Sequence, residues 1–167
     1  MPTKATVGTP AILALRRLGV PYAVHVYKHN PRDDLGFGLE AARATKFDPK
    51  RVFKTLMAAV DGRLCVAVVP VAGSLDLRAL AQAFRSKRAV MATVAVAERA
   101  TGYVVGGISP IAQRQSHPTV IDIHAQEFPT ILVSGGARGV DLELAPNDLA
   151  AVTQASFAPV ARMDAPL

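Results

Sequence analysis

The chain has 167 residues, half of them apolar, with six phenylalanines, three tyrosines and no tryptophan. This length predicts one domain over residues 1–167 with an aliphatic core. The longest apolar run, 64–72, is too short to cross a bilayer, and segment 1–8 has no apolar signal core. A single cysteine, Cys65, excludes an internal disulfide and CxxC chemistry. These features favour a cytoplasmic protein that is not bound to a membrane.

Charge is distributed unevenly along the chain. The formal net charge is +6 and the pI is about 9.9. Residues 1–120 hold 17 Lys and Arg against 7 Asp and Glu, whereas residues 121–167 hold two against six. Such polarity favours a polyanion on one side of the molecule. A solvated basic surface without a partner is the alternative.

The first predicted element is a helix over 11–18, because Thr9 is a good N-cap, Pro10 suits the first turn and Gly19 follows the end. Alternating residues over 22–27 predict a strand. Further along, the patterns predict a loop over 28–38, a helix over 39–46, hairpin strands over 52–60 and 63–69 joined by the turn Asp61-Gly62, a helix from Asp76 to about Phe84, a strand over 89–91, and a helix from Thr93 to Arg99.

The last third of the chain reads as strands with one closing helix. The strands are predicted over 119–123, 130–134 and 140–144, and the helix runs from Pro146 to about Ala155. Strands outnumber helices, and several neighbours are linked by hairpins. The pattern therefore predicts an α+β fold with a mixed, mainly antiparallel sheet.

The most informative single residue is Lys54, which stands in the apolar strand predicted over 52–60. Alternation places it on the same face as Leu56, Ala58 and Val60. An ammonium group on an apolar face is costly unless it reaches water or meets an anion. Lys54 therefore either extends past the strand end to solvent or binds a negatively charged ligand.

Two glycine-rich segments, Gly106-Gly107 and 134–139, each follow a β-type run. Consecutive glycines let backbone amides converge on an anionic oxygen or a developing oxyanion. They also suit tight turns at sheet corners, which is the alternative for each segment. Neither segment matches a P-loop or a dinucleotide-binding fingerprint.

The histidines do not have the spacing of a metal site, and no metal or cofactor is predicted. His25 is expected to be structural. A nucleophile–His–Asp triad cannot be assembled from the spacing either. Ser134 has no evident base nearby in the sequence and is expected to hydrogen-bond a ligand or to cap a turn.

Four further features allow both a structural and a functional interpretation. Tyr27 ends the first strand, as a rim residue or a ligand contact. Thr55 points away from the face of Lys54, where packing is the default. Asp141 begins a strand, as a solvated carboxylate or a site residue. The basic run Arg85-Ser86-Lys87-Arg88 is a solvated face or the best local phosphate-binding patch.

Taken together, these segments resemble the YbaK-type Cys-tRNA(Pro) deacylases, within the superfamily of prolyl-tRNA synthetase-associated editing domains. The resemblance lies in HVYKH (25–29), FKT (53–55), VAVVPVAGSLDL (66–77), ATGYVVGGISP (100–110), ILVSGGARG (131–139) and VDLELAP (140–146). The segments occur in the order of the family and cover nearly the whole chain. The two glycine motifs are the most specific of them.

The resemblance implies a compact α+β domain around a barrel-like sheet with flanking helices. It also implies trans-editing, the hydrolytic removal of cysteine or alanine from mischarged tRNA(Pro). The family's essential lysine falls on Lys54. Supporting positions fall on Tyr27, Thr55, Gly106, Ser134 and Asp141, and amides of Gly106 or Gly136 are candidate donors to the developing charge.

The resemblance further implies aminoacyl-tRNA as substrate, prolyl-tRNA synthetase as partner and no cofactor. In the cysteine-acting branch the substrate's own thiol attacks the ester, so that no protein nucleophile is needed. One departure is the segment 113–117, which is less rich in lysine than in many relatives. The alternatives are an Ala-tRNA(Pro) deacylase, a noncatalytic tRNA- or synthetase-binding module, and a small-metabolite binding protein.

Overall fold

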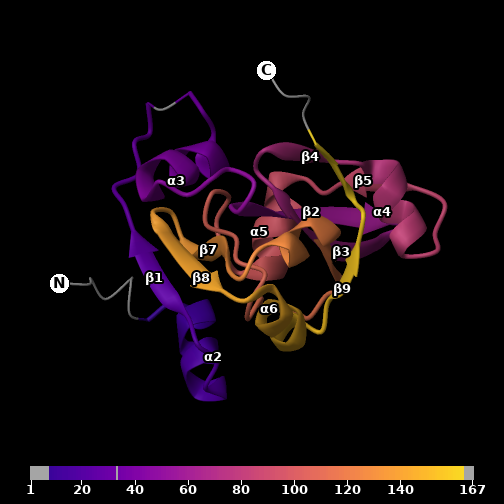
Figure 1. The fold of residues 1–167 in the computed structure, drawn as a ribbon. Coiled ribbons are helices and arrows are strands. Elements are labelled where there is room, and N and C mark those ends of the chain that lie inside the picture. Colours follow the sequence, from indigo (N-terminus) through magenta and orange to yellow (C-terminus); the bar gives the residue numbers. More distant parts are fainter. Residues whose placement is uncertain (1–7, 33, 164–167) are drawn as a thin grey trace.

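The structure, a computed structural model, describes residues 8–32 and 34–163 (Figure 1). The expectation for the N-terminal segment 1–8 therefore concerns residues that lie almost entirely outside the described part. Within the described ranges, no helix is long and apolar enough to cross a membrane.

The helices and strands follow the predicted order. The helices are α2 (Pro10–Leu18), α3 (Phe37–Thr45), α4 (Leu77–Ala83), α5 (Val94–Thr101) and α6 (Pro146–Thr153), and a short 3-10 helix is η1 (Ile123–Glu127). The strands are β1 (Ala23–Val26), β2 (Phe53–Val60), β3 (Arg63–Pro70), β4 (Gly73–Leu75), β5 (Ala89–Met91), β6 (Thr119–Asp122), β7 (Ile131–Ala137), β8 (Val140–Leu144), β9 (Ser156–Ala158) and β10 (Ala161–Met163).

Every helix and strand predicted from the sequence is present. The elements that the sequence did not predict are η1 and the three-residue strands β4, β9 and β10. The three strands pair with segments distant in the sequence, which local patterns do not show. The helix predicted from residue 39 begins at Phe37, and β7 extends to Ala137 instead of ending at Ser134.

The strands of the described chain form three sheets, in the orders β1-β8-β7, β10-β4 and β5-β2-β3-β6-β9. Only the pairs β3-β6 and β6-β9 are parallel, so the α+β class and the mainly antiparallel pairing are confirmed. The barrel-like closure is not found. In the described ranges Val52, the residue before β2, forms an isolated bridge with Leu132 of β7, and a bulge lies between Ser134 and Ala137 of β7. A bulge bends its strand and interrupts the ladder, so a continuous closed sheet does not form.

The two faces of the five-stranded sheet pack into two separate apolar clusters. Phe53 and Met57 of β2 face the cluster that contains residues of α2, α5 and α6. Ala58 and Val60 face the cluster that contains residues of α4, and this face also carries Lys54, as predicted. Cys65 lies in this second cluster, where burial raises the pKa of its thiol to about 11. A buried thiol with a raised pKa is mostly protonated at neutral pH, as is typical of a cysteine that serves packing.

Side-chain caps fix the helix starts that the sequence indicates. Thr9 Oγ1 accepts a hydrogen bond from the backbone N–H of Ile12 at 3.2 Å, and Gly19 ends α2 with φ 68°. Asp76 and Thr93 cap α4 and α5 in the same way. Each such cap satisfies a backbone donor that the helix itself leaves open.

Two glycines let backbone segments approach where a side chain would not fit. A Cβ on Gly107 would lie 2.9 Å from Cα of Ala137 and from the backbone N of Arg138. A Cβ on Gly139 would collide with the carbonyl oxygen of Tyr27, whose N–H donates to the Gly139 carbonyl at 2.9 Å. These contacts bring the end of β1, the segment before Ile108 and the β7–β8 turn together.

We expect Gly139→Ala to destabilise the protein much more than Gly62→Ala. Both glycines have positive φ (79° and 83°), which costs about 1–2 kcal/mol for a residue with a Cβ. At Gly62 the added methyl group meets nothing within 4 Å, whereas at Gly139 it meets backbone. Overpacking adds about 1–3 kcal/mol. Urea unfolding of the two variants measures the difference, and equal losses would show that the close approach is unimportant.

Candidate functional site

A cavity of about 350 Å³ lies between α3, the edge of β2, the start of α5 and the β7–β8 hairpin. Its polar side chains are those of Tyr27, Lys54, Thr55, Ser134 and Asp141. The remaining lining is apolar or glycine: Phe37, Gly38, Ala41, Val52, Phe53, Leu56, Met57, Met91, Ala92, Val94, Ala97, Val105, Gly106 and Ile108. The structure thus brings six of the seven residues predicted as the site around one cavity, and leaves out Gly136.

The cavity exists because β5 covers only part of β2. The two strands pair from Ala58 to Val60 alone, so the edge of β2 before Ala58 faces the cavity instead of a neighbouring strand. Side chains from both faces of β2 reach such an open edge. This explains why Thr55, predicted on the face opposite Lys54, lines the same cavity.

Lys54 supplies a positive charge at the wall of this cavity. Its side chain is partly buried, and Nζ donates a hydrogen bond to the carbonyl oxygen of Gly73 at 3.0 Å. Gly73 is the first residue of β4, which pairs with β10. The ammonium group is therefore anchored between β2 and β4, and Lys54 is one of the residues that line the cavity.

Two buried oxygen atoms in the cavity wall have no hydrogen-bond partner in the described chain: Thr55 Oγ1 and Asp141 Oδ2. Asp141 is only 7% exposed, and burial raises the pKa of its carboxyl group to about 7. Buried polar atoms are nearly always hydrogen-bonded in native proteins. Two such oxygens in one wall are therefore an unusual feature of this cavity.

Tyr27 places a phenol beside this carboxyl group. Burial raises the pKa of Tyr27 far above its ordinary value, and the negative charges of Asp141 and Glu40 add to the effect. The phenol consequently stays protonated at any physiological pH and can donate a hydrogen bond. The ladder pairs Ser134 with Asp141, so the two side chains lie on one face of their sheet.

A buried carboxylate holds α3 over the cavity. Glu40, 4% exposed, binds His29 Nδ1 at 2.7 Å and accepts from the backbone N–H of Asn30 at 2.9 Å. At the start of α3, the ring of Phe37 packs so closely on Gly106 that a Cβ there would lie 2.5 Å from it. The helix is thereby tied to the chain after β1 and to the first glycine segment.

The first glycine segment is fixed from two further sides. Glu98 Oε2 of α5 accepts from the backbone N–H of Val105 at 2.8 Å, and Arg138 Nε donates to the Val105 carbonyl at 2.9 Å. The Arg138 guanidinium also lies 5.1 Å from the centre of the Phe37 ring. Sequence reasoning missed Phe37, Glu40 and Glu98, because an aromatic or acidic residue on a helix carries no signal of its tertiary partner.

Gly136 takes a different position from the one that the sequence suggested. Its N–H donates to Ser134 Oγ at 3.2 Å, and a Cβ on it would lie 2.8 Å from the ring of Tyr103. The glycine allows the bulge of β7 to pack on Tyr103. Its amide is engaged inside the hairpin, which leaves Gly106 as the lining glycine of the pair.

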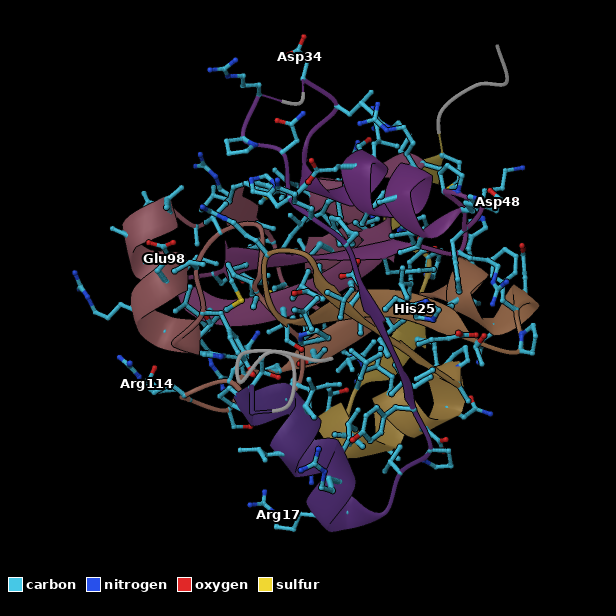
Figure 2. The ribbon with its side chains drawn as sticks, turned by 90° about the vertical axis from the view of Figure 1, so that its left-hand side faces the viewer. Arg17, His25, Asp34, Asp48, Glu98 and Arg114 are labelled. Carbon is cyan, nitrogen blue, oxygen red and sulfur yellow. The ribbon has the colours of Figure 1, made fainter. Side chains whose placement is uncertain are left out.

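A second polar cluster shares the sheet face of Asp141 but has a structural role. His25 Nε2 binds Glu143 Oε1 at 2.8 Å, Thr130 Oγ1 donates to Glu143 Oε2 at 2.6 Å, and Arg51 Nη2 donates to Thr130 Oγ1 at 2.7 Å. Figure 2 views the molecule from the side of β1 and shows His25 on that strand. Over residues 8–32 and 34–163, no three His, Cys, Asp or Glu side chains are grouped to hold a metal ion.

Comparisons with known proteins show which family the chain belongs to. The profile of the aminoacyl-tRNA editing domain matches residues 39–152. A protein of Enterococcus faecalis with the provisional name Cys-tRNA(Pro)/Cys-tRNA(Cys) deacylase EbsC is 33% identical over 154 residues, which cover 91% of this chain and 92% of the relative. The chain belongs to the aminoacyl-tRNA editing domain family.

Two solved structures share the fold. One is a protein described provisionally as a trans-editing enzyme for prolyl-tRNA synthetase, with a TM-score of 0.81, 21% identity, and coverage of 92% of this chain and 95% of that one. The other is the hypothetical protein APE2540, with a TM-score of 0.80, 21% identity, and coverage of 92% and 99%. The predicted α+β fold class is thereby confirmed.

We expect Asp141→Asn to stabilise the protein at pH 8 but not at pH 4. The folded-state pKa of about 7 lies above the ordinary 3.8, so the folded state binds more protons between these values and stability falls as the pH rises through them. At about 1.4 kcal/mol per pKa unit, ionisation costs roughly 4 kcal/mol. Thermal unfolding at both pH values measures this, with the exposed Asp34→Asn as control. A pH-independent difference would contradict the burial argument.

Proposed function

We propose that the protein cleaves the ester bond of mischarged aminoacyl-tRNA, with Cys-tRNA(Pro) as its main substrate. The observation that carries the proposal is the cavity, which combines the Lys54 ammonium with two unsatisfied buried oxygens, Thr55 Oγ1 and Asp141 Oδ2. Family membership and the similarity to the E. faecalis protein support it. Such an activity would place the protein in the cytoplasm, where tRNA is charged and used.

The polar groups of the cavity match those of an aminoacyl ester. Every aminoacyl-tRNA carries an α-ammonium group, and the Asp141 carboxylate offers it an oxygen without a partner. Tyr27 and Thr55 supply neighbouring hydroxyl groups, and the Gly106 backbone lies near enough to line the same space. Lys54 supplies positive charge for the terminal phosphate or for the oxygen that becomes negative during ester cleavage.

The lining contains neither cysteine nor histidine, so it offers no Ser–His or Cys–His pair, and we assign the attacking group to the substrate. The cysteine sulfur attacks the ester carbonyl carbon, the bond from that carbon to the ribose oxygen breaks, and the thiol proton ends on the ribose oxygen. Water then opens the resulting cyclic thioester and releases cysteine. The protein's contribution is to hold thiol and ester in reacting geometry and to stabilise the developing charge.

Selection of tRNA(Pro) is assigned to a partner, prolyl-tRNA synthetase. The cavity is large enough for an aminoacyl group and its ribose, and it reads nothing of the distant anticodon. A synthetase that has just released the mischarged tRNA already holds that information. The similarity in fold to a protein described as a trans-editing enzyme for this synthetase is consistent with the assignment.

We expect Lys54→Ala and Lys54→Met to lower deacylation of Cys-tRNA(Pro) by at least about 100-fold, the range for loss of one charge-stabilising group. Lys54→Met keeps the apolar stem and separates charge from packing. The exposed Lys50→Ala is the matched control and should stay active. The assay follows release of labelled amino acid from Cys-, Ala- and Pro-tRNA(Pro).

Lys54-dependent loss of cysteine with proline spared is the expected result. Loss of alanine in preference to cysteine would change the substrate to Ala-tRNA(Pro). No loss above the spontaneous rate, with folded protein and synthetase present, would sink the enzyme proposal and leave a binding module.

We expect kcat/KM for Cys-tRNA(Pro) to fall as the pH drops below about 7, since the free enzyme then loses the Asp141 carboxylate that pairs with the α-ammonium. Asp141→Asn should raise KM and remove the part of this acid limb that depends on the carboxylate, leaving the part due to the substrate thiol. With N-acetyl-Cys-tRNA(Pro), which lacks the ammonium charge, wild type and Asp141→Asn should react at similar rates. An equal loss on both substrates would remove Asp141 from ammonium recognition.

A further inference from the structure

Four basic side chains gather at one end of the five-stranded sheet. Arg85, Lys87 and Arg88 lie in the turn between α4 and β5, and Arg63 opens β3 at the same end, since Val60 pairs with both Arg63 and Ala89. All four are exposed. None of them forms an ion pair with a carboxylate of residues 8–32 or 34–163.

The basic turn, residues 85–88, is held in one shape by Asp61. The carboxylate accepts from the backbone N–H groups of Lys87 and Arg88 at 3.1 and 3.0 Å, and the Asp61 N–H donates to the Arg88 carbonyl at 2.9 Å. These bonds lower the pKa of Asp61, and its negative charge is directed at the backbone N–H groups of the turn. The basic side chains are left to project into solvent.

β5 leads directly from the basic turn to the cavity. It is the edge strand of its sheet, and both Met91 at its end and Ala92 after it line the cavity. At about 3.3 Å per residue, the three residues from Arg88 to Met91 span about 10 Å. Val90 and Met91 are exposed apolar side chains along this path, and Val94 continues it at the cavity.

We propose that the basic turn and β5 bind the single-stranded 3′ end of the tRNA, with the phosphates on Arg85, Lys87 and Arg88 and the bases against the apolar strand. The inference rests on the proposed function, which fixes the aminoacyl end in the cavity. The short path from the turn to the cavity suits the last few nucleotides before the aminoacyl end. Single-stranded RNA offers both negative phosphates and apolar base faces, and the path from turn to cavity presents a partner for each.

The test compares Arg85→Ala/Arg88→Ala with a matched double variant, Arg16→Ala/Arg17→Ala. Arg16 and Arg17 are exposed at the end of α2, which lies at the lower left of Figure 1, away from α4 and β5 on the right; Figure 2 shows Arg17 at that end. For Cys-tRNA(Pro) without synthetase, we expect the first variant to raise KM about ten-fold with kcat unchanged. Loss of two phosphate contacts should also flatten the dependence of log KM on log salt by about 1.4.

A second substrate separates this inference from the proposed function. Cysteinyl-adenosine has the ester but no upstream phosphate, and wild type and Arg85→Ala/Arg88→Ala should cleave it equally well. Inactivity of wild type on both substrates would overturn the proposed function itself. If wild type is active and KM shifts equally in the two double variants, the RNA path is overturned. A KM shift that appears only when synthetase is added would also overturn it, and would make the turn a protein-binding surface.

Discussion

The site depends on a close approach of backbone to backbone that only glycine permits. Gly107 lies against the chain at Ala137 and Arg138, and Gly139 lies against the carbonyl of Tyr27. These two contacts hold three segments that are far apart in the sequence at fixed distances from each other. Tyr27, Gly106 and the Ser134–Asp141 pair therefore reach one cavity without any covalent link or metal ion among the described residues.

The same packing creates an energetic conflict at Asp141. A carboxyl group 7% exposed and without a partner for Oδ2 is a poor choice for stability, because burial opposes its ionisation. Glu40 is buried even more deeply, yet it has a histidine and a backbone amide as partners. The Glu40 carboxylate therefore stabilises the fold, whereas the Asp141 carboxyl group retains an oxygen without a hydrogen-bond partner. Unsatisfied groups of the second kind are typical of binding sites, where the ligand completes the hydrogen bonds.

Sequence patterns predicted the fold class, the long elements and most of the cavity's polar residues, because alternation, caps and glycine motifs are local signals. They could not show that β5 pairs only with Ala58–Val60 of β2, which leaves the earlier edge of β2 open and brings Thr55 into the cavity from the opposite face. They also placed Gly136 in the site, whereas the bulge directs it to Tyr103. The prediction of a barrel-like closure was wrong for the same reason. The bulge and the single bridge depend on tertiary packing, and no residue pattern shows how they interrupt the hydrogen-bond ladder.

Because its lining offers no nucleophile–histidine pair, the cavity must act on the reaction mainly through geometry. If the substrate carries the attacking sulfur, rate enhancement comes from holding thiol and ester together, and small displacements of the wall are costly. This accounts for the number of hydrogen bonds that fix the cavity wall. Glu40 binds the chain after β1, Glu98 and Arg138 bind Val105, and Lys54 binds Gly73. A binding module would need the charges alone. The rigid anchoring of each charge-bearing segment is the feature of this structure that favours an enzyme.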